Sequence, residues 1–302
     1  MKLKLKILSL ALLLSLFITN TFNIFSVSAE EIPHLNLNEF IQLGLEPLDL
    51  CDQRLVENDS FLNFTKNNPD VTLAFIEEAY YKVEIDSKAK AFGKTTLSNP
   101  DNIIKTKYTK EEYEAEEAKN NNSAIDIYGV SGDKTFSWIY VRMYGHKSSN
   151  GRYAFSFAYE WLKQPFFQGK DAIVIGADSN WPIKSSTISG YHINKVSGKI
   201  FRTDYNWYSE DLKSRGANTY GINVNLTSTS LSTSTAYGAI SCEAEASQST
   251  TRAGKVFGGY AHRQGTINLD FSFNPSDFSF NLGLSPGFTY DEATLSATMY
   301  AE

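Results

Sequence analysis

The stretch HKSSNGRYAFSFAYEWLKQP, residues 146–165, decides the fold of this 302-residue chain. After an Asn-Gly pair it places an aromatic ring at every second position: Tyr153, Phe155, Phe157, Tyr159 and Trp161. A period of two is typical of a β-strand, because successive side chains point to opposite faces of a sheet. The Asn-Gly pair favours a tight turn before this strand. The sequence therefore predicts a β-hairpin whose strands cover residues 136–144 and 153–162.

The turn sets which residues of this hairpin face each other. A two-residue turn at Asn150 and Gly151 predicts three facing pairs: Tyr144 with Phe157, Arg142 with Tyr159, and Tyr140 with Trp161. This register gathers the rings of both strands, with Trp138, on one face of the hairpin. The reverse face carries smaller apolar residues, so burial between two layers is the expected outcome for the hairpin as a whole.

The aromatic face has two interpretations. Exposed, it would suit sugar rings, which stack on Trp and Tyr, and Arg142 would be a cation–π partner there. Buried, it would be part of a core, which uses the same residues. A further ring, Trp181, follows Asp178 and Asn180 in the loop GADSNWPI. The predicted ligand-binding residues are Trp138, Tyr140, Arg142, Tyr159, Trp161 and Trp181.

Period-two patterns recur through the remainder of the chain. Further strands are predicted at residues 172–175, 221–226, 237–246, 267–273 and 278–284, separated by Gly, Asn, Pro and Ser clusters. Many short strands with little helix between them indicate a mainly β domain over residues 124–302, an antiparallel sandwich or partly open barrel. The last two strands form an apolar hairpin that we expect to complete the core.

The first 123 residues differ from this pattern. Residues 1–29 join a basic start, an apolar run and a small-residue end, which predicts a signal peptide and a secreted, extracellular protein. Residues 30–119 are predicted to be a helical N-terminal segment. Its helices are NPDVTLAFIEEAYYKVEID, with apolar residues at helical spacing, and YTKEEYEAEEAK, which opens with Thr109 and Glu112 in capping-box spacing. Residues 120–123 are a linker.

The net charge disfavours one class of partner, and the two cysteines leave a disulfide open. The formal net charge is −6, and it becomes −9 once residues 1–29, with three lysines and no acids, are removed. An acidic chain disfavours nucleic acid as a partner. Cys51 and Cys242 would reach a compartment that permits disulfides. Two alternatives stay open: a Cys51–Cys242 disulfide, or two separate buried thiols.

A second candidate region is LTSTSLSTSTAYGAISCEAEAS, residues 226–247. Its Ser/Thr-rich half is followed by alternating apolar and polar residues, and an edge strand or polar loop is one interpretation. The stretch also resembles the membrane-inserting hairpins of aerolysin-like β-pore-forming toxins. The resemblance covers this stretch alone and implies a membrane-active, pore-forming protein that inserts Leu226, Leu231 and Ile240 into a bilayer.

Motifs for catalysis are absent from the sequence. It contains no G-x-S-x-G, H-E-x-x-H, P-loop or G-x-G-x-x-G, and the four histidines are far apart, so no metal site, cofactor or catalytic residue is predicted. The sequence favours a non-enzymatic binding or interaction protein whose partner is a cell-surface glycan or another envelope protein. A pore-forming protein that acts on membranes is one alternative. A secreted hydrolase with unidentified carboxylates is the other.

Overall fold

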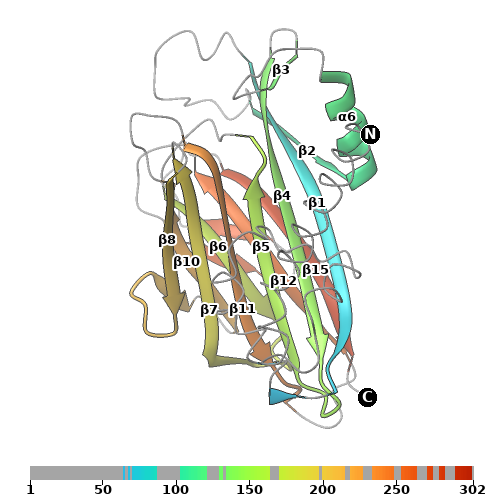
Figure 1. Cartoon of the computed structure of the whole chain (residues 1–302). Coiled ribbons are helices and arrows are strands. Elements are labelled where there is room, and N and C mark those ends of the chain that lie inside the picture. Colours follow the sequence, from blue (N-terminus) through green and yellow to red (C-terminus); the bar gives the residue numbers. More distant parts are fainter. Residues whose placement is uncertain are drawn as a thin grey trace, which may run out of the picture.

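Two antiparallel β-sheets packed face to face form the body of the protein (Figure 1). The structure is a computed structural model. It describes residues 64, 67–68, 70–86, 103–120, 129–131, 134–163, 170–196, 199–214, 218–226, 233–247, 253–263, 271–274, 279–282 and 290–300. The mainly β prediction is confirmed. Of the two architectures predicted, the structure is the sandwich, because the two sheets are separate and do not close into a barrel.

The larger sheet has eight strands in the order β2-β1-β4-β5-β11-β7-β8, with β3 paired to β4. Its strands are β1 (Thr72–Asp86), β2 (Ile103–Tyr108), β3 (Gly129–Ser131), β4 (Lys134–Lys147), β5 (Tyr153–Trp161), β7 (Ile183–Val196), β8 (Lys199–Asn206) and β11 (Thr233–Ala244). The hairpin quoted above therefore lies in the interior of this sheet, with β1 on one side and β11 on the other.

The smaller sheet has five strands in the order β15-β12-β6-β10-β9. They are β6 (Lys170–Ala177), β9 (Leu212–Ser214), β10 (Thr219–Asn225), β12 (Ala253–Arg263) and β15 (Tyr290–Tyr300). A separate two-stranded sheet pairs β13 (Phe271–Asn274) with β14 (Ser279–Leu282). The predicted C-terminal hairpin thus overlaps β13 and β14, but the strand that extends the smaller sheet is β15, which the sequence patterns did not reveal.

The hairpin exists with a register one residue away from the predicted one. Gly151 has φ +77°, in the left-handed region, its N–H donates to the carbonyl of Ser148, and Ser148 in turn pairs with Arg152. Three residues therefore form the loop, a type I turn followed by a glycine bulge, in place of the predicted two. The observed facing pairs are Tyr144 with Ser156, Arg142 with Ala158, Tyr140 with Glu160, and Ile139 with Trp161.

This shift corrects the prediction that the rings of both strands share a face. A one-residue slip moves every side chain of one strand to the opposite face. The five rings of β5 accordingly share a face with Ile139, Val141 and Met143 and point into the sandwich, whereas Trp138, Tyr140, Arg142 and Tyr144 of β4 point outward from it.

The prediction of a helical N-terminal segment is wrong for residues 72–86, the part with the clearest helical spacing. Thr72–Asp86 is strand β1, paired with β4 along its length and with β2 on its other side. Its sequence fits both the period of two of a strand and the period of a helix. In the strand, Ala79, Tyr81 and Val83 point toward the core. Pairing with β4 decided between them, because tertiary context overrides local preference.

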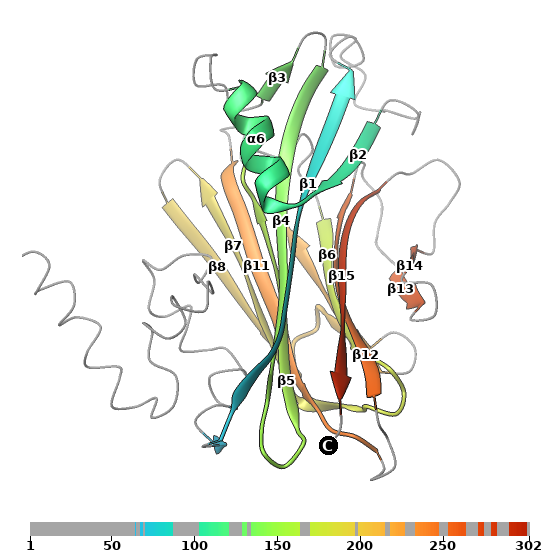
Figure 2. The same ribbon diagram turned by 90° about the vertical axis from the view of Figure 1, so that its right-hand side faces the viewer.

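The second predicted helix is confirmed as α6 (Lys110–Asn120). Its capping box is formed: Glu112 N–H donates to Thr109 Oγ1 at 3.3 Å, and Thr109 N–H donates to a Glu112 carboxylate oxygen at 2.8 Å. Figure 2 shows α6 lying over β1 and β4 on the outside of the larger sheet. Among the described residues no helix is long and apolar enough to cross a membrane. The predicted signal peptide lies outside the described residues.

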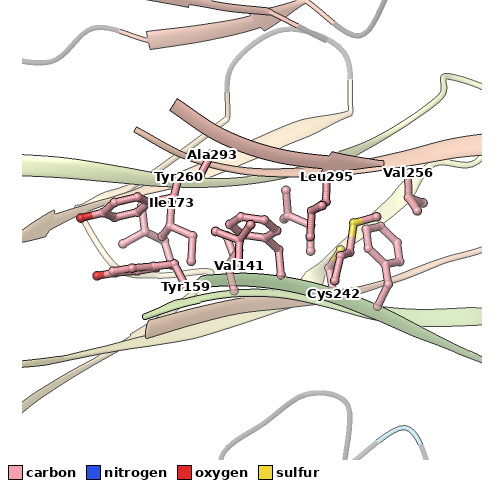
Figure 3. Packing of buried hydrophobic residues seen from close by; sticks show 14 of the residues in the cluster. Val141, Tyr159, Ile173, Cys242, Val256, Tyr260, Ala293 and Leu295 are labelled. Atoms are coloured by element: carbon pink, nitrogen blue, oxygen red, sulfur yellow. The ribbon is translucent and has the colours of Figure 1, made fainter. Parts of the chain in front are cut away.

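The core is the layer of side chains between the two sheets. The β5 rings meet Ile173, Ile175 and Tyr260 from the smaller sheet there. Figure 3 shows this layer, with Tyr159 and Tyr260 side by side near one end of it. Close approach is needed at Gly258, where an added Cβ would come within 2.3 Å of the Phe157 ring. Bulky rings on one sheet are therefore accommodated by glycine backbone on the other.

Five of the predicted strands lie within β4 and β6 or overlap β5, β10 and β11. Strands β1, β2, β3, β7, β8, β9, β12 and β15 were not predicted. Several of these carry Gly, Ser, Thr or charged residues on both faces, as in IKSSTISGYHINKV for β7. Such strands have weak period-two patterns, and their pairing partners specify them.

Candidate functional site

All six side chains predicted to bind ligand are buried. The three tryptophans, Trp138, Trp161 and Trp181, have no exposed surface, and Tyr140, Arg142 and Tyr159 are at most 9% exposed. The structure thus assigns them to packed environments, the outcome that the core interpretation predicted. A ligand-binding role for any of them stays a prediction. Their surroundings differ, and three separate places result: one inside the sandwich, one under α6 and one at a turn beside β12.

Tyr159 and Trp161 belong to a buried polar cluster inside the sandwich. Trp161 Nε1 donates to the hydroxyl of Tyr260 at 2.9 Å, and the Tyr260 hydroxyl donates to the carboxylate of Asp171. The same carboxylate lies 3.0 Å from Nδ1 of His262. The rings of Tyr159 and Tyr260 stack with centroids 3.8 Å apart.

A second histidine extends this cluster. Tyr159 Oη lies 2.6 Å from Nδ1 of His192, and the other ring nitrogen of His192 is 3.0 Å from the carbonyl of Asn225. Burial lowers the pKa of His192 and raises the pKa values of Tyr159 and Tyr260 well above their usual range. The topology thus brings together two histidines and an aspartate that are far apart in sequence, but it seals them in the core, where they fix the packing of the two sheets.

The outer face of β4 carries Trp138, Tyr140 and Arg142. Helix α6 covers part of this face, and side chains of the neighbouring strand β1 flank it. Tyr113 of α6 stacks on Tyr80 of β1 with centroids 4.4 Å apart, and it meets the ring of Trp138 edge-on at 4.8 Å. The Tyr140 hydroxyl donates to Glu78 at 2.8 Å. The guanidinium of Arg142 lies 5.8 Å from the Tyr144 ring centroid, within cation–π range.

Two lysines hold α6 on this face. Lys82 Nζ donates to Glu116 at 2.8 Å, and Lys163 Nζ donates to Glu117 at 3.0 Å. The pKa of Glu116 is lowered chiefly by its hydrogen bond from Lys82. Burial acts to lower the pKa of Lys82, but Glu116 and Glu84 outweigh it, so the net shift is upward. Ion pairs of this kind contribute about 0.2–1 kcal/mol each and a stacked ring pair about 0.5–1.5 kcal/mol.

A groove opens beside the N-terminus of α6. It has a volume of about 470 Å³, and its walls come from β1, β2 and the first turn of α6. The lining residues are Glu78, Lys107, Tyr108, Thr109, Lys110, Glu111 and Glu112. It mixes both signs of charge around one aromatic ring, Tyr108, and it is shallow and open to solvent. Trp138, under α6, is adjacent to it through an edge-on contact with Tyr108 at 5.1 Å.

Two adjacent exposed aromatic residues lie elsewhere, at the turn between β8 and β9. We call residues 206–211 the aromatic turn. Tyr208 is 90% exposed and Trp207 is 38% exposed, which sets Trp207 apart from the other three tryptophans. The Trp207 ring meets Tyr220 of β10 edge-on, with centroids 5.9 Å apart. Figure 1 shows β8, which leads into this turn, at one edge of the larger sheet.

Hydrogen bonds fix the aromatic turn. The side-chain oxygen of Asn206 accepts from Tyr208 N–H at 2.9 Å, and Ser209 Oγ accepts from Asn206 N–H at 2.9 Å. Ser209 N–H donates to the Asn206 carbonyl at 2.9 Å. Buried side chains anchor both ends, Tyr205 before the turn and Leu212 after it. Two rings are therefore presented to water on a backbone held by its own side chains, as Asx-type turns do.

Sequence reasoning missed this turn, although a signal was present. The letters YNWYSEDL place Asn and Ser, both turn formers, on either side of two adjacent aromatic residues. The alternation of β8 was too weak to show that a strand ends here.

Trp181 closes a turn beside β12. Its ring covers Gly254, where a Cβ would lie 2.0 Å from the indole, and meets Tyr153 edge-on at 5.3 Å. Trp181 N–H donates to the Asp178 carbonyl within the turn at 2.9 Å, and the Asp178 side chain joins the turn to β12 by accepting from Lys255 N–H at 2.7 Å.

The remaining predicted residues are in the core or outside the described residues. Leu226 and Ile240 are buried, and β11, which carries Ile240, lies between β5 and β7. Insertion of β11 into a bilayer would require breaking both pairings. Leu231 and Cys51 lie outside the described residues. Cys242 is buried with a raised thiol pKa and forms no disulfide with any described residue, so the Cys51–Cys242 pairing stays a prediction.

Three acidic side chains outside the buried cluster have separate contacts. Asp178 accepts from Lys255 N–H of β12, Asp204 pairs with Arg202, and Glu210 is exposed at the aromatic turn. Within the part of the chain that the structure describes, no three or more His, Cys, Asp or Glu residues are grouped so as to hold a metal ion.

Comparisons with known proteins give similarities to solved structures only. No protein-family model and no curated protein matches the chain. The collagen-binding domain of a Staphylococcus aureus adhesin aligns with 50% of this chain and 89% of its own, at 6% identity and a TM-score of 0.29. The collagen-binding domain of the Erysipelothrix rhusiopathiae surface protein RspB aligns with 57% and 71%, at 4% identity and a TM-score of 0.27.

A third structure covers more of the chain. The C-terminal domain of the Streptococcus agalactiae antigen I/II polypeptide BspA aligns with 74% of this chain and 84% of its own, at 9% identity and a TM-score of 0.27. All three TM-scores are below 0.5, so these similarities do not establish a shared fold or family. The function has to be argued from the residues of this chain.

Proposed function

We propose that this protein is a non-enzymatic binding protein that acts at the cell envelope or outside the cell, and that the aromatic turn contacts its ligand. The observation that carries the proposal is the exposure of Trp207 and Tyr208 on a fixed backbone. An exposed ring of this size is informative, because the other tryptophans of this chain are fully buried. A ring that is already ordered loses little conformational entropy when a ligand covers it.

Glycan is the ligand class that fits this turn best. Sugar rings present C–H faces that pack on Trp and Tyr, while their hydroxyls need nearby hydrogen-bonding groups. The turn supplies both: two aromatic rings, with the exposed carboxylates of Glu210 and Asp211 beside them. The net charge of −6 favours a neutral or basic glycan over a strongly anionic one. Secretion directed by residues 1–29 would bring the turn to such ligands.

Binding to chitin, cellulose and purified peptidoglycan, measured by co-sedimentation with the wild-type protein, tests the proposal. We expect binding to at least one of these, and a loss of about tenfold or more in affinity for Trp207→Ala, since buried aromatic anchors carry most of the energy of such contacts. Tyr300→Ala is the matched control, because Tyr300 is also a largely exposed ring, far from the turn.

Two results would contradict the proposal. Equal loss of binding in Trp207→Ala and Tyr300→Ala would show that the effect is not local to the turn. Tight binding by a Trp207→Ala, Tyr208→Ala double variant that keeps its thermal unfolding midpoint would place the ligand elsewhere. If the wild-type protein fails to bind any of the three glycans, the glycan assignment is wrong, and the same variants are then tested against extracellular proteins.

A further inference from the structure

Helix α6 is docked on the larger sheet without the apolar stripe that usually holds a surface helix. Its sequence, KEEYEAEEAKN, has only three apolar residues, Tyr113, Ala115 and Ala118. A short helix that is polar on almost all sides is not stable by itself in water. What fixes α6 is therefore the set of specific contacts that the sheet offers to Tyr113, Glu116 and Glu117.

The sheet face under α6 recognises two carboxylates over an aromatic ring. Lys82 Nζ lies 4.6 Å and Lys163 Nζ 4.7 Å from the centroid of the same ring, Phe136. Each lysine holds one of the two glutamates, and Trp138 Nε1 donates a further hydrogen bond to Glu117 at 2.8 Å. We call these four residues, Lys82, Phe136, Trp138 and Lys163, the basic-aromatic face.

Pairings within the larger sheet position most of the basic-aromatic face. Lys82 faces Trp138, and Glu84 faces Phe136, in the regular pairing of β1 with β4. Glu84 lies 3.5 Å from Lys82 Nζ on the same strand, so this lysine keeps a partner when Glu116 leaves. The backbone of Lys163 is fixed by a hydrogen bond of 2.8 Å from Ser137 Oγ to its carbonyl.

We propose that the basic-aromatic face is a second binding site, that its ligand is an acidic helical segment of a partner protein, and that α6 is a cover which this segment displaces. The chemistry of the ligand follows from what the face holds now. Tyr113, Glu116 and Glu117 have the i, i+3, i+4 spacing of one helix face, which is how a helix is recognised in a groove.

Charge supports displacement over permanent docking. Of the four side chains in the two ion pairs, Glu116, Glu117 and Lys163 are 18–24% exposed and Lys82 is 5% exposed, so added salt weakens the Lys163–Glu117 pair more than the Lys82–Glu116 pair. The contacts under the helix do not extend to its N-terminal glutamates: Glu111 and Glu114 are exposed and provide a matched control of equal charge.

The first experiment follows hydrogen exchange by mass spectrometry in the wild-type protein. Amides of residues 112–119 are expected to exchange at least tenfold faster than those of residues 136–144, and to exchange faster still in 0.5 M NaCl, while β4 stays protected. Exchange of α6 and β4 at one common rate, at both salt concentrations, would show that α6 is a fixed part of the fold and would overturn the cover.

The second experiment measures binding in trans, with a fluorescent, side-chain-stapled peptide of residues 110–120 as the probe. The E116Q/E117Q variant, in which the cover is weakened, is expected to bind the peptide at least tenfold more tightly than the wild type, whereas E111Q/E114Q should match the wild type within about twofold. Adding Lys82→Met to E116Q/E117Q should abolish binding.

Three results overturn the proposal: no binding of the peptide by E116Q/E117Q, binding that Lys82→Met leaves unchanged, or preferential binding of trigalacturonate, which would make the ligand a carboxylated saccharide. The aromatic turn is intact in all these variants. Failure here therefore leaves the glycan assay of Trp207 and Tyr208 unaffected, and failure of that assay leaves this site unaffected.

Discussion

The pH dependence of stability should report the burial of His146. This residue lies on β4 between Leu73 of β1 and Ala154 of β5, and only 1% of its surface is exposed. Its ring meets Tyr144 edge-on at 6.1 Å. Burial lowers the pKa of His146 from its usual 6.5 to about 3, because the cationic form would lose its hydration. The substitution His146→Leu removes the titrating group and puts an apolar side chain of similar size in its place.

The sign and size of the effect follow from proton linkage. Between pH 6.5 and pH 3 the unfolded chain binds a proton at this histidine and the folded chain does not, so the free energy of unfolding falls as the pH falls. With pKa values of 6.5 unfolded and about 3 folded, the loss between pH 8 and pH 5 is about 2 kcal/mol. The contribution is fully present above pH 6.5.

Urea unfolding at pH 8 and pH 5 measures this loss. The wild-type protein is expected to lose about 2 kcal/mol more than His146→Leu over this interval. The comparison cancels any change in stability that the substitution causes at both pH values, and it cancels the contribution of His192, which is present in both proteins. Equal losses in the two proteins would refute the reasoning and would mean that His146 reaches water in the folded state.

Three further predictions concern the core, the hairpin turn and the last strand. Asp171→Ala leaves the buried hydroxyl of Tyr260 and Nδ1 of His262 without their acceptor, so the free energy of unfolding in urea should fall by about 3–5 kcal/mol. Asp204→Ala, at an exposed residue, is the control and should lower it by under about 1 kcal/mol. Similar losses in the two variants would contradict the buried cluster. Gly151→Ala forces a Cβ into the left-handed region and should cost about 1–2 kcal/mol in the same assay, although no atom lies within 4 Å of that Cβ; an unchanged unfolding midpoint would argue for a different turn. Ending the chain before Gly265 removes β15, which pairs with the whole of β12 and buries Ala293, Leu295 and Met299. Size-exclusion chromatography and circular dichroism are therefore expected to show no soluble folded protein. A soluble product that unfolds cooperatively would contradict the role of β15 in completing the core.

Local patterns predicted the parts of the fold that local chemistry specifies. The β5 rings alternate without interruption and form a buried strand, and the capping residues Thr109 and Glu112 begin a helix where expected. The patterns failed where two periods coincide. Residues 72–86 match both a helix and a strand, and only the pairing partners β2 and β4, which are distant in sequence or not recognisable as strands, select the strand.

The hairpin register shows how one backbone angle changes a functional interpretation. The sequence does not reveal whether Gly151 is the second residue of a two-residue turn or the third of a three-residue loop. The observed loop sends the β5 rings into the sandwich and Trp138 and Tyr140 out toward α6. A single aromatic platform is thereby divided into a core and a covered outer face.

The predicted binding residues were chosen by ring type, and ring type does not indicate exposure. Trp138, Trp161 and Trp181 were selected and are buried, while Trp207, which was not selected, is at the surface. What distinguishes Trp207 is its place in a turn closed by Asn206 and Ser209, and the weak alternation of β8 did not show that a strand ends there. The buried cluster of Asp171, His192 and His262 is likewise a product of sheet topology.

The central claim is that Trp207 is the exposed tryptophan and that the rings of β4 and β5 are covered. Acrylamide quenching of tryptophan fluorescence tests this claim most directly, measured in the folded wild-type protein and in Trp207→Phe. The account predicts two classes of emission in the wild type, one quenched and one protected, and only the protected class in Trp207→Phe, because Trp138, Trp161 and Trp181 have no exposed surface. Strong quenching that persists in Trp207→Phe would place at least one of Trp138, Trp161 and Trp181 in water and contradict the account.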